Sequence, residues 1–238
     1  MDNERALADL AKKAIKEWDV DVESINLYLQ SENTVFKVEG TNGNTYALRI
    51  HRKGYHDLEE LNSEHAWTSC LSNAGLSVPE AVATRNGQAY ASVSFLNSDE
   101  CRYVGLVKWL EGTILNDLIL GLEEKDVSDL YESFGRVIAK FHEATMTWEV
   151  PKDFKRHSFD TQGFLGSKPF WGRFWESENA NSIERQALTL IRNNLIESFS
   201  KLPKDIKFFG MIHADMHSQN VLIQGEKLSV IDFDDAGF

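Results

Sequence analysis

Apolar residues recur at helical spacing in several stretches of the chain. The first stretch predicts an amphipathic helix over residues 5–17, because its apolar side chains fall three and four residues apart: Leu7, Leu10, Ala11, Ala14, Ile15 and Trp18. The second predicts a helix over 57–74, where Asp57 can cap the start and Gly75 falls just past the end. Similar periodicity predicts helices over 126–144 and 182–200.

Between these helices lie shorter runs that alternate or are β-branched. They predict strands over 25–30, 34–39 and 44–51, joined by turns at 31–34 and at Asn42-Gly43, and further strands over 81–84, 89–95 and 103–109. We expect these strands to form a five-stranded antiparallel sheet. The fold class is therefore α+β, with a sheet-containing lobe over residues 1–110 and a largely helical lobe over 111–238.

The end of the chain combines polar residues with a predicted hairpin. Apolar strands over 221–223 and 228–231 flank a turn at Gly225, so the hairpin should bring Asn220 and Asp232 side by side. Asp215 lies on the loop before it. Carboxylate and amide oxygens suit a hard cation such as Mg²⁺, which takes few protein ligands. One further carboxylate then remains to accept a proton.

Composition narrows the function classes. The net charge of −12 argues against a nucleic-acid surface. The acidic N-terminus is unlike a signal peptide, and no apolar run approaches the ~20 residues that span a bilayer, so we expect a soluble, cytoplasmic protein without membrane contact. The two cysteines, Cys70 and Cys101, show no metal-like spacing and fit a reducing compartment.

The order of polar residues near the C-terminus matches that of kinases. His213, Asp215 and Asn220 fit H-x-D-x-x-x-x-N, and Asp232-Phe233-Asp234 stands where protein kinases have Asp-Phe-Gly. His213-Ala214-Asp215 together with I-D-F-D-D-A-G resembles the aminoglycoside phosphotransferase and choline kinase family, most of all its bacterial homoserine-kinase-like and stress-response members. The resemblance implies a two-lobed protein-kinase-like fold. It also implies ATP and Mg²⁺ as cofactors, Asp215 as catalytic base, and Asn220 and Asp232 as metal ligands.

The same resemblance assigns roles upstream. Ala47 and Arg49 occupy the third strand, where kinases have a small residue against adenine and a lysine on the phosphates; the arginine prefers bidentate partners. Glu64 would pair with Arg49, with Glu59 and Glu60 as alternatives. The turn residues that would lie over the phosphates are Ser31, Asn33 and Thr34. The hinge over 107–112 would take adenine near Lys108 and Trp109, where the indole either stacks on the base or packs.

Two further stretches bear on the small molecule that would accept the phosphate and on the completeness of the C-terminal lobe. Residues 148–178 interleave aromatic and basic side chains; Asp160, Trp171 and Trp175 either form a pocket for a cationic group or simply pack. The chain stops six residues after Asp232 (238 − 232 = 6), whereas members of the family continue for several helices. We therefore expect an incomplete C-lobe whose open apolar faces favour self-association.

Three functions follow from these patterns. The first is an ATP-dependent phosphotransferase that moves the γ-phosphate to a hydroxyl of a small molecule, such as an amino alcohol, a homoserine-like compound, a sugar or an aminoglycoside. The second is a non-catalytic nucleotide-binding pseudokinase or an inactive truncated family member. The third is a metal-dependent hydrolase that uses His213, Asp215 and His217.

Overall fold

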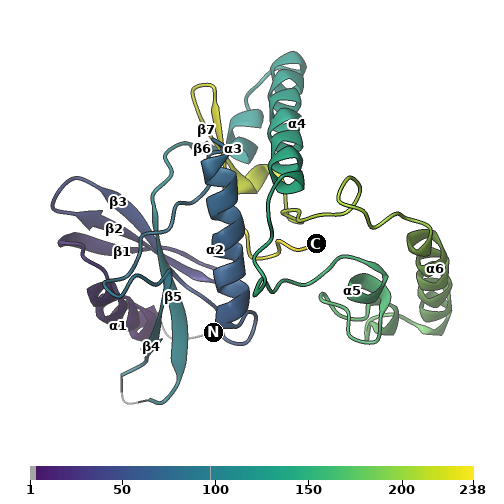
Figure 1. The fold of residues 1–238 in the computed structure, drawn as a ribbon, viewed down its shortest axis with the longest axis horizontal. Coiled ribbons are helices and arrows are strands. Elements are labelled where there is room, and N and C mark those ends of the chain that lie inside the picture. Colours follow the sequence, from purple (N-terminus) through teal and green to yellow (C-terminus); the bar gives the residue numbers. More distant parts are fainter. Residues whose placement is uncertain (1–3, 97) are drawn as a thin grey trace.

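The computed structural model describes residues 4–96 and 98–238 (Figure 1). A five-stranded antiparallel sheet with the order β1-β2-β3-β5-β4 forms the N-terminal part. Its strands are β1 (Val22–Gln30), β2 (Thr34–Gly40), β3 (Thr45–Ile50), β4 (Tyr90–Ser94) and β5 (Cys101–Lys108). Helix α1 (Glu4–Ala14) packs on this sheet and helix α2 (Leu58–Asn73) runs beside it, as Figure 1 shows.

The five-stranded sheet is confirmed, but the strand predicted over 81–84 is wrong. This segment makes only an isolated bridge, Ala81 to Val107, supported by hydrogen bonds such as that from the Val82 N–H to the Leu106 carbonyl at 2.8 Å. The chain then turns, and the Gly87 N–H donates to the Thr84 carbonyl at 2.8 Å. The run is therefore too short to add a strand. The first helix also ends earlier than predicted, at Ala14, and continues as a 3₁₀ turn.

The core of the N-terminal part lies between α1 and one face of the sheet. Phe36 and Val38 on β2 alternate with less buried positions and meet Leu48 and Ile50 of β3 on the same side. Trp18 closes this core, and its indole N–H donates to the Val82 carbonyl at 2.7 Å. Because one face of the five-stranded sheet is buried in this core, the opposite face is free to line a cavity.

The C-terminal part is built around a smaller sheet. Strands β6 (Thr113–Ile114), β7 (Val221–Gln224) and β8 (Lys227–Val230) pair in the order β6-β7-β8. The predicted hairpin is present, with Val221 opposite Val230 and Gly225 in the left-handed conformation at φ 60°. Helix α4 (Glu124–Met146) is two residues longer at each end than predicted, and the short helix α3 (Leu115–Ile119) was not expected.

An aromatic cluster joins α2 and α4 to the end of the chain. Phe233 is 1 % exposed and lies between Trp67 of α2 and Phe141 of α4, with ring centroids at 5.6 and 6.1 Å. The Trp67 indole N–H donates to the Thr145 hydroxyl at 3.0 Å. Since such a buried ring is costly to displace, Phe233 fixes the backbone on either side of it.

Helices α5 (Thr161–Leu165) and α6 (Ser182–Ser200) lie side by side, away from the rest of the molecule in Figure 1. The helix predicted over 182–200 is confirmed, yet its apolar side is open: Ile183 is 77 % and Ile191 48 % exposed. Self-association through such faces stays a prediction. Within the described residues, no helix combines the length and apolar character that crossing a membrane requires.

Candidate active site

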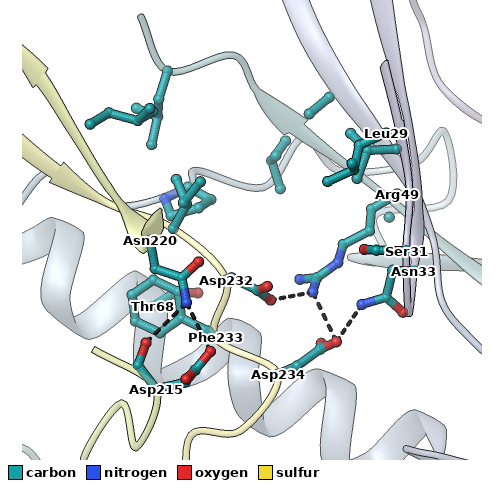
Figure 2. A pocket seen from close by; sticks show the side chains of 18 of the residues that line it. Leu29, Ser31, Asn33, Arg49, Thr68, Asp215, Asn220, Asp232, Phe233 and Asp234 are labelled. Carbon is teal, nitrogen blue, oxygen red and sulfur yellow. Dashed lines mark hydrogen bonds and ion pairs between the residues drawn. The ribbon is translucent and has the colours of Figure 1, made fainter. Parts of the chain in front are cut away.

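A cavity of about 700 Å³ lies between the five-stranded sheet and the β7–β8 hairpin. Nearly all of the residues predicted for the site line it: Ser31, Asn33, Ala47, Arg49, Glu64, Lys108, Trp109, Asp215, Asn220 and Asp232. Figure 2 shows how side chains from both ends of the chain converge on it. The hairpin and the sheet thus bring together residues that are far apart in the sequence.

Asp215 is held by its neighbours on the loop before β7. The Asn220 amide N–H groups donate to the Asp215 carboxylate and to its backbone carbonyl, both at 2.9 Å. His217 Nε2 lies 3.4 Å from the same carboxylate. With the amide nitrogen of Asn220 turned to Asp215, its amide oxygen points away, on the side of Asp232 (Figure 2). The side chain of Asp215 is 41 % exposed, so its carboxylate is accessible from the cavity.

His213 braces this loop. Its Nδ1 accepts from the Asp215 N–H at 3.3 Å, so Nε2 carries the proton and donates to the Ile231 carbonyl at 3.0 Å. Burial lowers the pKa of His213, which favours this neutral form. Ala214 and Asp232 are both left-handed, with φ 65°. Such backbone strain at non-glycine residues is typical of functional sites.

The Arg49 side chain lies among three carboxylates. One guanidinium nitrogen lies 2.7 Å from Asp232 and 2.9 Å from Asp234, and the other lies 3.7 Å from Glu64. The expected pairing of Arg49 with Glu64 is therefore present, whereas Glu60 forms a capping box with Asp57 and Glu59 pairs with Lys155. These ion pairs explain an arginine on β3, since a planar fork can hold several carboxylates at once.

Burial and neighbouring charges together set the pKa values of the carboxylates in this cluster. Burial, followed by the nearby Asp234, raises the pKa of Glu64 to about 7, against the opposing effect of Arg49 and Arg156. For Asp234, burial raises the pKa, but the charge of Arg49 outweighs it, and the pKa falls to about 2. Asp234 is therefore the ionised partner of Arg49 at neutral pH.

The turn between β1 and β2 differs from expectation. Asn33 is 7 % exposed, and its amide donates to the Asp234 carboxylate while its oxygen accepts from the Arg52 N–H at 2.9 Å. The side chain of Asn33 thus anchors the turn. Thr34 does not line the main cavity; it faces a separate cavity of about 160 Å³, because successive strand residues point to opposite sides. Of the three, Ser31 and Asn33 lie at the main cavity.

The hinge end of the cavity is lined by Ala47, Lys108 and Trp109. The Lys108 N–H is bonded to the Glu80 carbonyl at 2.9 Å, and its ammonium to the Glu80 carboxylate at 2.6 Å. Trp109 packs edge to face on Tyr28, with ring centroids 4.9 Å apart. The structure therefore shows Trp109 packed, with part of its surface at the cavity wall.

The aromatic and basic stretch over 148–178 is held by contacts with other parts of the chain. Asp160 caps α5 and forms an ion pair with Lys204 at 2.6 Å. Trp175 is covered by Arg192, whose guanidinium lies 4.3 Å from the ring centroid. Of the two alternatives for Asp160, Trp171 and Trp175, the structure supports packing, because the carboxylate that a cationic group would need is already paired.

The donors at the hairpin fit a hard divalent cation. Asp232 and Asn220 present a carboxylate and an amide oxygen at the cavity, a set that suits Mg²⁺ with several waters. Among residues 4–96 and 98–238, no group of three or more His, Cys, Asp and Glu side chains could hold a metal ion. The hydrolase hypothesis needed such a group at His213, Asp215 and His217, and His213 instead braces the loop.

One prediction concerns His157, whose Nε2 lies 3.0 Å from the Asp235 carbonyl. Burial, and then the charge of Arg156, lowers the pKa of His157 from 6.5 to about 4. Since the unfolded chain binds more protons between these values, we expect the free energy of unfolding to fall as the pH is lowered from 6.5 toward 4. The His157 ring stacks on Phe170, with ring centroids 3.5 Å apart. Replacing His157 with phenylalanine, which can keep this stack, should flatten the decline in urea unfolding across pH.

The exposed His142 offers a matched control. His142→Phe should leave the dependence of stability on pH as in the parent chain. A His157→Phe protein with an unchanged dependence would assign the acid loss to other groups.

The family follows from comparison with known proteins. A model described as the phosphotransferase enzyme family matches residues 28–238, and the chain belongs to this family. The family resemblance and the two-lobed kinase-like fold inferred from the sequence are thereby confirmed.

Individual relatives are small-molecule kinases. The amicoumacin kinase of Bacillus subtilis (strain 168) is 23 % identical over 99 % of this chain and 64 % of its own length. A microcompartment-associated aminopropanol kinase superposes with a TM-score of 0.80 at 29 % identity, over 97 % of this chain and 70 % of that one. The amicoumacin kinase hAmiN, solved with AMP-PNP, Ca²⁺ and Ami, gives a TM-score of 0.78 at 19 % identity, over 99 % and 65 %. This chain thus spans less than two thirds of the curated amicoumacin kinase.

Several residues of the site were not predicted from the sequence. Asp234 was noted only as the residue in place of a kinase glycine, yet it binds Arg49 and Asn33. Arg156 lies among the basic residues of the stretch over 148–178 and was given no role, although its side chain is fully buried. His56 lies against the Asp234 carbonyl at 2.7 Å and had no motif to mark it. The second aspartate of Asp-Phe-Asp was the one available signal.

Proposed function

We propose that the protein transfers the γ-phosphate of ATP to a hydroxyl group of a small molecule that carries an amine. The observation that carries this proposal is the Asp215–Asn220 unit, which faces the same cavity as Asp232 and Arg49. A hydroxyl-directed carboxylate, a divalent metal site and a nucleotide-sized cavity are the parts that phosphoryl transfer needs.

In the proposed reaction the acceptor oxygen forms a new bond to the γ-phosphorus as the bond to the β–γ bridging oxygen breaks. Asp215 accepts the hydroxyl proton, and ADP leaves with the electron pair. Asn220 and Asp232 would hold Mg²⁺, which neutralises phosphate charge when bound. Asn220 also keeps the Asp215 carboxylate oriented through the 2.9 Å hydrogen bond.

Arg49 and the hinge would place the nucleotide. Arg49 orients Asp232 through the 2.7 Å ion pair, and its remaining contacts are carboxylates, so we assign it to positioning rather than to direct phosphate binding. Adenine would lie toward Ala47, Lys108 and Trp109 at the far end of the cavity. Ser31 lies at the turn and is the proposed phosphate contact there, since Asn33 is already bonded.

An acceptor with an amine is supported by charge and by the relatives. Asp117 and Asp235 line the cavity together with Asp215, and they remain acidic partners once the metal and nucleotide are in place. Aminopropanol kinase and amicoumacin kinase are among the similar proteins. A cytoplasmic location is proposed because ATP is the phosphate donor and the cysteines, Cys70 and Cys101, are free.

The test is ADP release from Mg-ATP by the 238-residue chain with a panel of acceptors. The panel holds amino alcohols, homoserine, sugars and aminoglycosides, and it pairs 1-amino-2-propanol with 1,2-propanediol to isolate the amine. We expect turnover with hydroxyl acceptors and a higher kcat/KM for 1-amino-2-propanol than for 1,2-propanediol. Equal values for these two compounds would remove the amine from the proposal.

The same assay separates the pseudokinase alternative. AMP-PNP binding by the chain, combined with no ADP release above the rate without acceptor for the whole panel, would favour a non-catalytic nucleotide-binding protein. Loss of both binding and turnover would contradict the phosphotransferase proposal and the pseudokinase alternative together.

A further inference from the structure

The four residues that follow Asp232 have their backbone carbonyls bonded to side chains from distant segments. Arg156 donates from Nε to the Ala236 carbonyl at 2.6 Å, and from a terminal nitrogen to the Phe233 carbonyl at 3.1 Å and to the Asp234 carbonyl. His56 Nε2 lies 2.7 Å from the Asp234 carbonyl, and His157 Nε2 lies 3.0 Å from the Asp235 carbonyl. A carbonyl only accepts, so each imidazole donates its Nε2 proton.

Arg156 also connects this segment to α2. Its side chain is 0 % exposed, and its other terminal nitrogen lies 3.6 Å from the Glu64 carboxylate and 3.4 Å from the Glu60 carbonyl. Glu64 in turn pairs with Arg49, which binds Asp232. A buried guanidinium that satisfies carbonyls on one side and a carboxylate on the other is costly to move, because each lost contact leaves a buried polar group unpaired.

The backbone at Asp232 needs such support. Its φ of 65° is unfavourable for a non-glycine residue, so it persists only where the surroundings fix it. The side chain of the next residue, Phe233, is held in place by its burial between Trp67 and Phe141. This apolar packing does not fix the rotation of the peptide planes after Asp232. The hydrogen bonds to the backbone carbonyls do fix it.

We infer that Arg156, with His56 and His157, forms a carbonyl clamp that holds residues 233–236 so that the Asp232 carboxylate faces the metal site before the metal binds. Arg156 is the main positioning residue, because it contacts the carbonyls of Phe233, Asp234 and Ala236, whereas each histidine contacts one carbonyl. This inference rests on the proposed function in one respect, namely that Asp232 is a metal ligand.

The test compares AMP-PNP affinity in excess Mg²⁺ and in EDTA by calorimetry, and the readout is the ratio of the two dissociation constants. Loss of a group that orients a metal ligand lowers metal affinity about 10- to 100-fold. We therefore expect Arg156→Met to reduce the Mg²⁺-dependent gain in affinity by about tenfold or more, with the affinity in EDTA unchanged. Arg156→Lys, which keeps the charge but not the fork, should fall between Arg156→Met and the parent chain.

Hydrogen exchange gives a second readout without metal or nucleotide. Amides over 233–236 should exchange faster in Arg156→Met and in His157→Phe. The control is Arg192→Met: Arg192 also donates to a backbone carbonyl, that of Leu165 at 2.9 Å, but on α6 and away from the cavity. It should change neither the Mg²⁺-dependent gain nor exchange over 233–236.

Asp232→Asn tests the proposed metal role of Asp232 separately from the carbonyl clamp. If it leaves the Mg²⁺-dependent gain intact, the proposed metal role fails and the clamp fails with it. If it abolishes the gain while Arg156→Lys and His157→Phe keep the parent gain and the parent exchange, the clamp alone is overturned. This second comparison decides the matter even where Arg156→Met does not fold, because the other two variants retain a buried charge or a stacked ring.

Discussion

Replacing Asp215 with asparagine is expected to lower kcat for the proposed phosphoryl transfer by a factor on the order of 10²–10⁴, the contribution of a positioned general base. The change is nearly isosteric, so Asn220 can still bond the side chain through its remaining oxygen. The KM for Mg-ATP should stay unchanged, because Asp232 and Asn220 keep their oxygens at the proposed metal site. Steady-state ADP release with saturating acceptor measures both constants.

Asp129 provides the matched control. It is an exposed aspartate on α4, away from the residues that line the cavity, and Asp129→Asn should leave kcat and KM as in the parent chain. Turnover that is unaffected by Asp215→Asn would overturn the assignment of Asp215 as base. A loss confined to KM would instead make Asp215 a binding residue.

The parts of the fold that the sequence predicted well are those with strong local signals. The hairpin around Gly225 combined apolar runs with a turn residue, and the structure pairs Val221 with Val230 as expected. The segment 81–84 failed because its apolar run looked like a strand, while the β5 edge offers it only a bridge at Val107. Whether a short apolar run pairs depends on tertiary neighbours, which local periodicity does not contain.

The residues of the site likewise divide into those with a local sequence signal and those without one. Asp215, Asn220 and Asp232 lie within one short stretch, and their order fits kinases, so they could be placed from the sequence. The contact of Asn33 with Asp234 joins residues 201 positions apart, and no spacing in the sequence links the two. Arg156 lies in the aromatic and basic stretch over 148–178, where no spacing distinguishes it from the other cations, and only the fold buries it against Glu64. Long-range polar contacts of this kind carry no periodic signal.

The replacement of a β3 lysine by Arg49 has a consequence for the whole site. A lysine ammonium is a single point charge, whereas a guanidinium can bind Asp232, Asp234 and Glu64 in different directions. Asp234 occupies the position where protein kinases have glycine. The arginine and the second aspartate are thus best understood together, as one ion-pair network that links β3, α2 and the segment after β8.

Replacing Arg49 with methionine is therefore expected to lower the free energy of unfolding by about 3–5 kcal/mol, because it leaves the buried carboxylates of Asp234 and Glu64 without their shared cation. Arg49→Lys should cost less, since it keeps the charge but reaches fewer carboxylates. Urea unfolding at neutral pH measures both. Arg136, which pairs with Glu132 on the exposed side of α4, is the control, and Arg136→Met should cost at most about 1 kcal/mol. A loss for Arg49→Met as small as that of the control would show that these ion pairs contribute little to the fold.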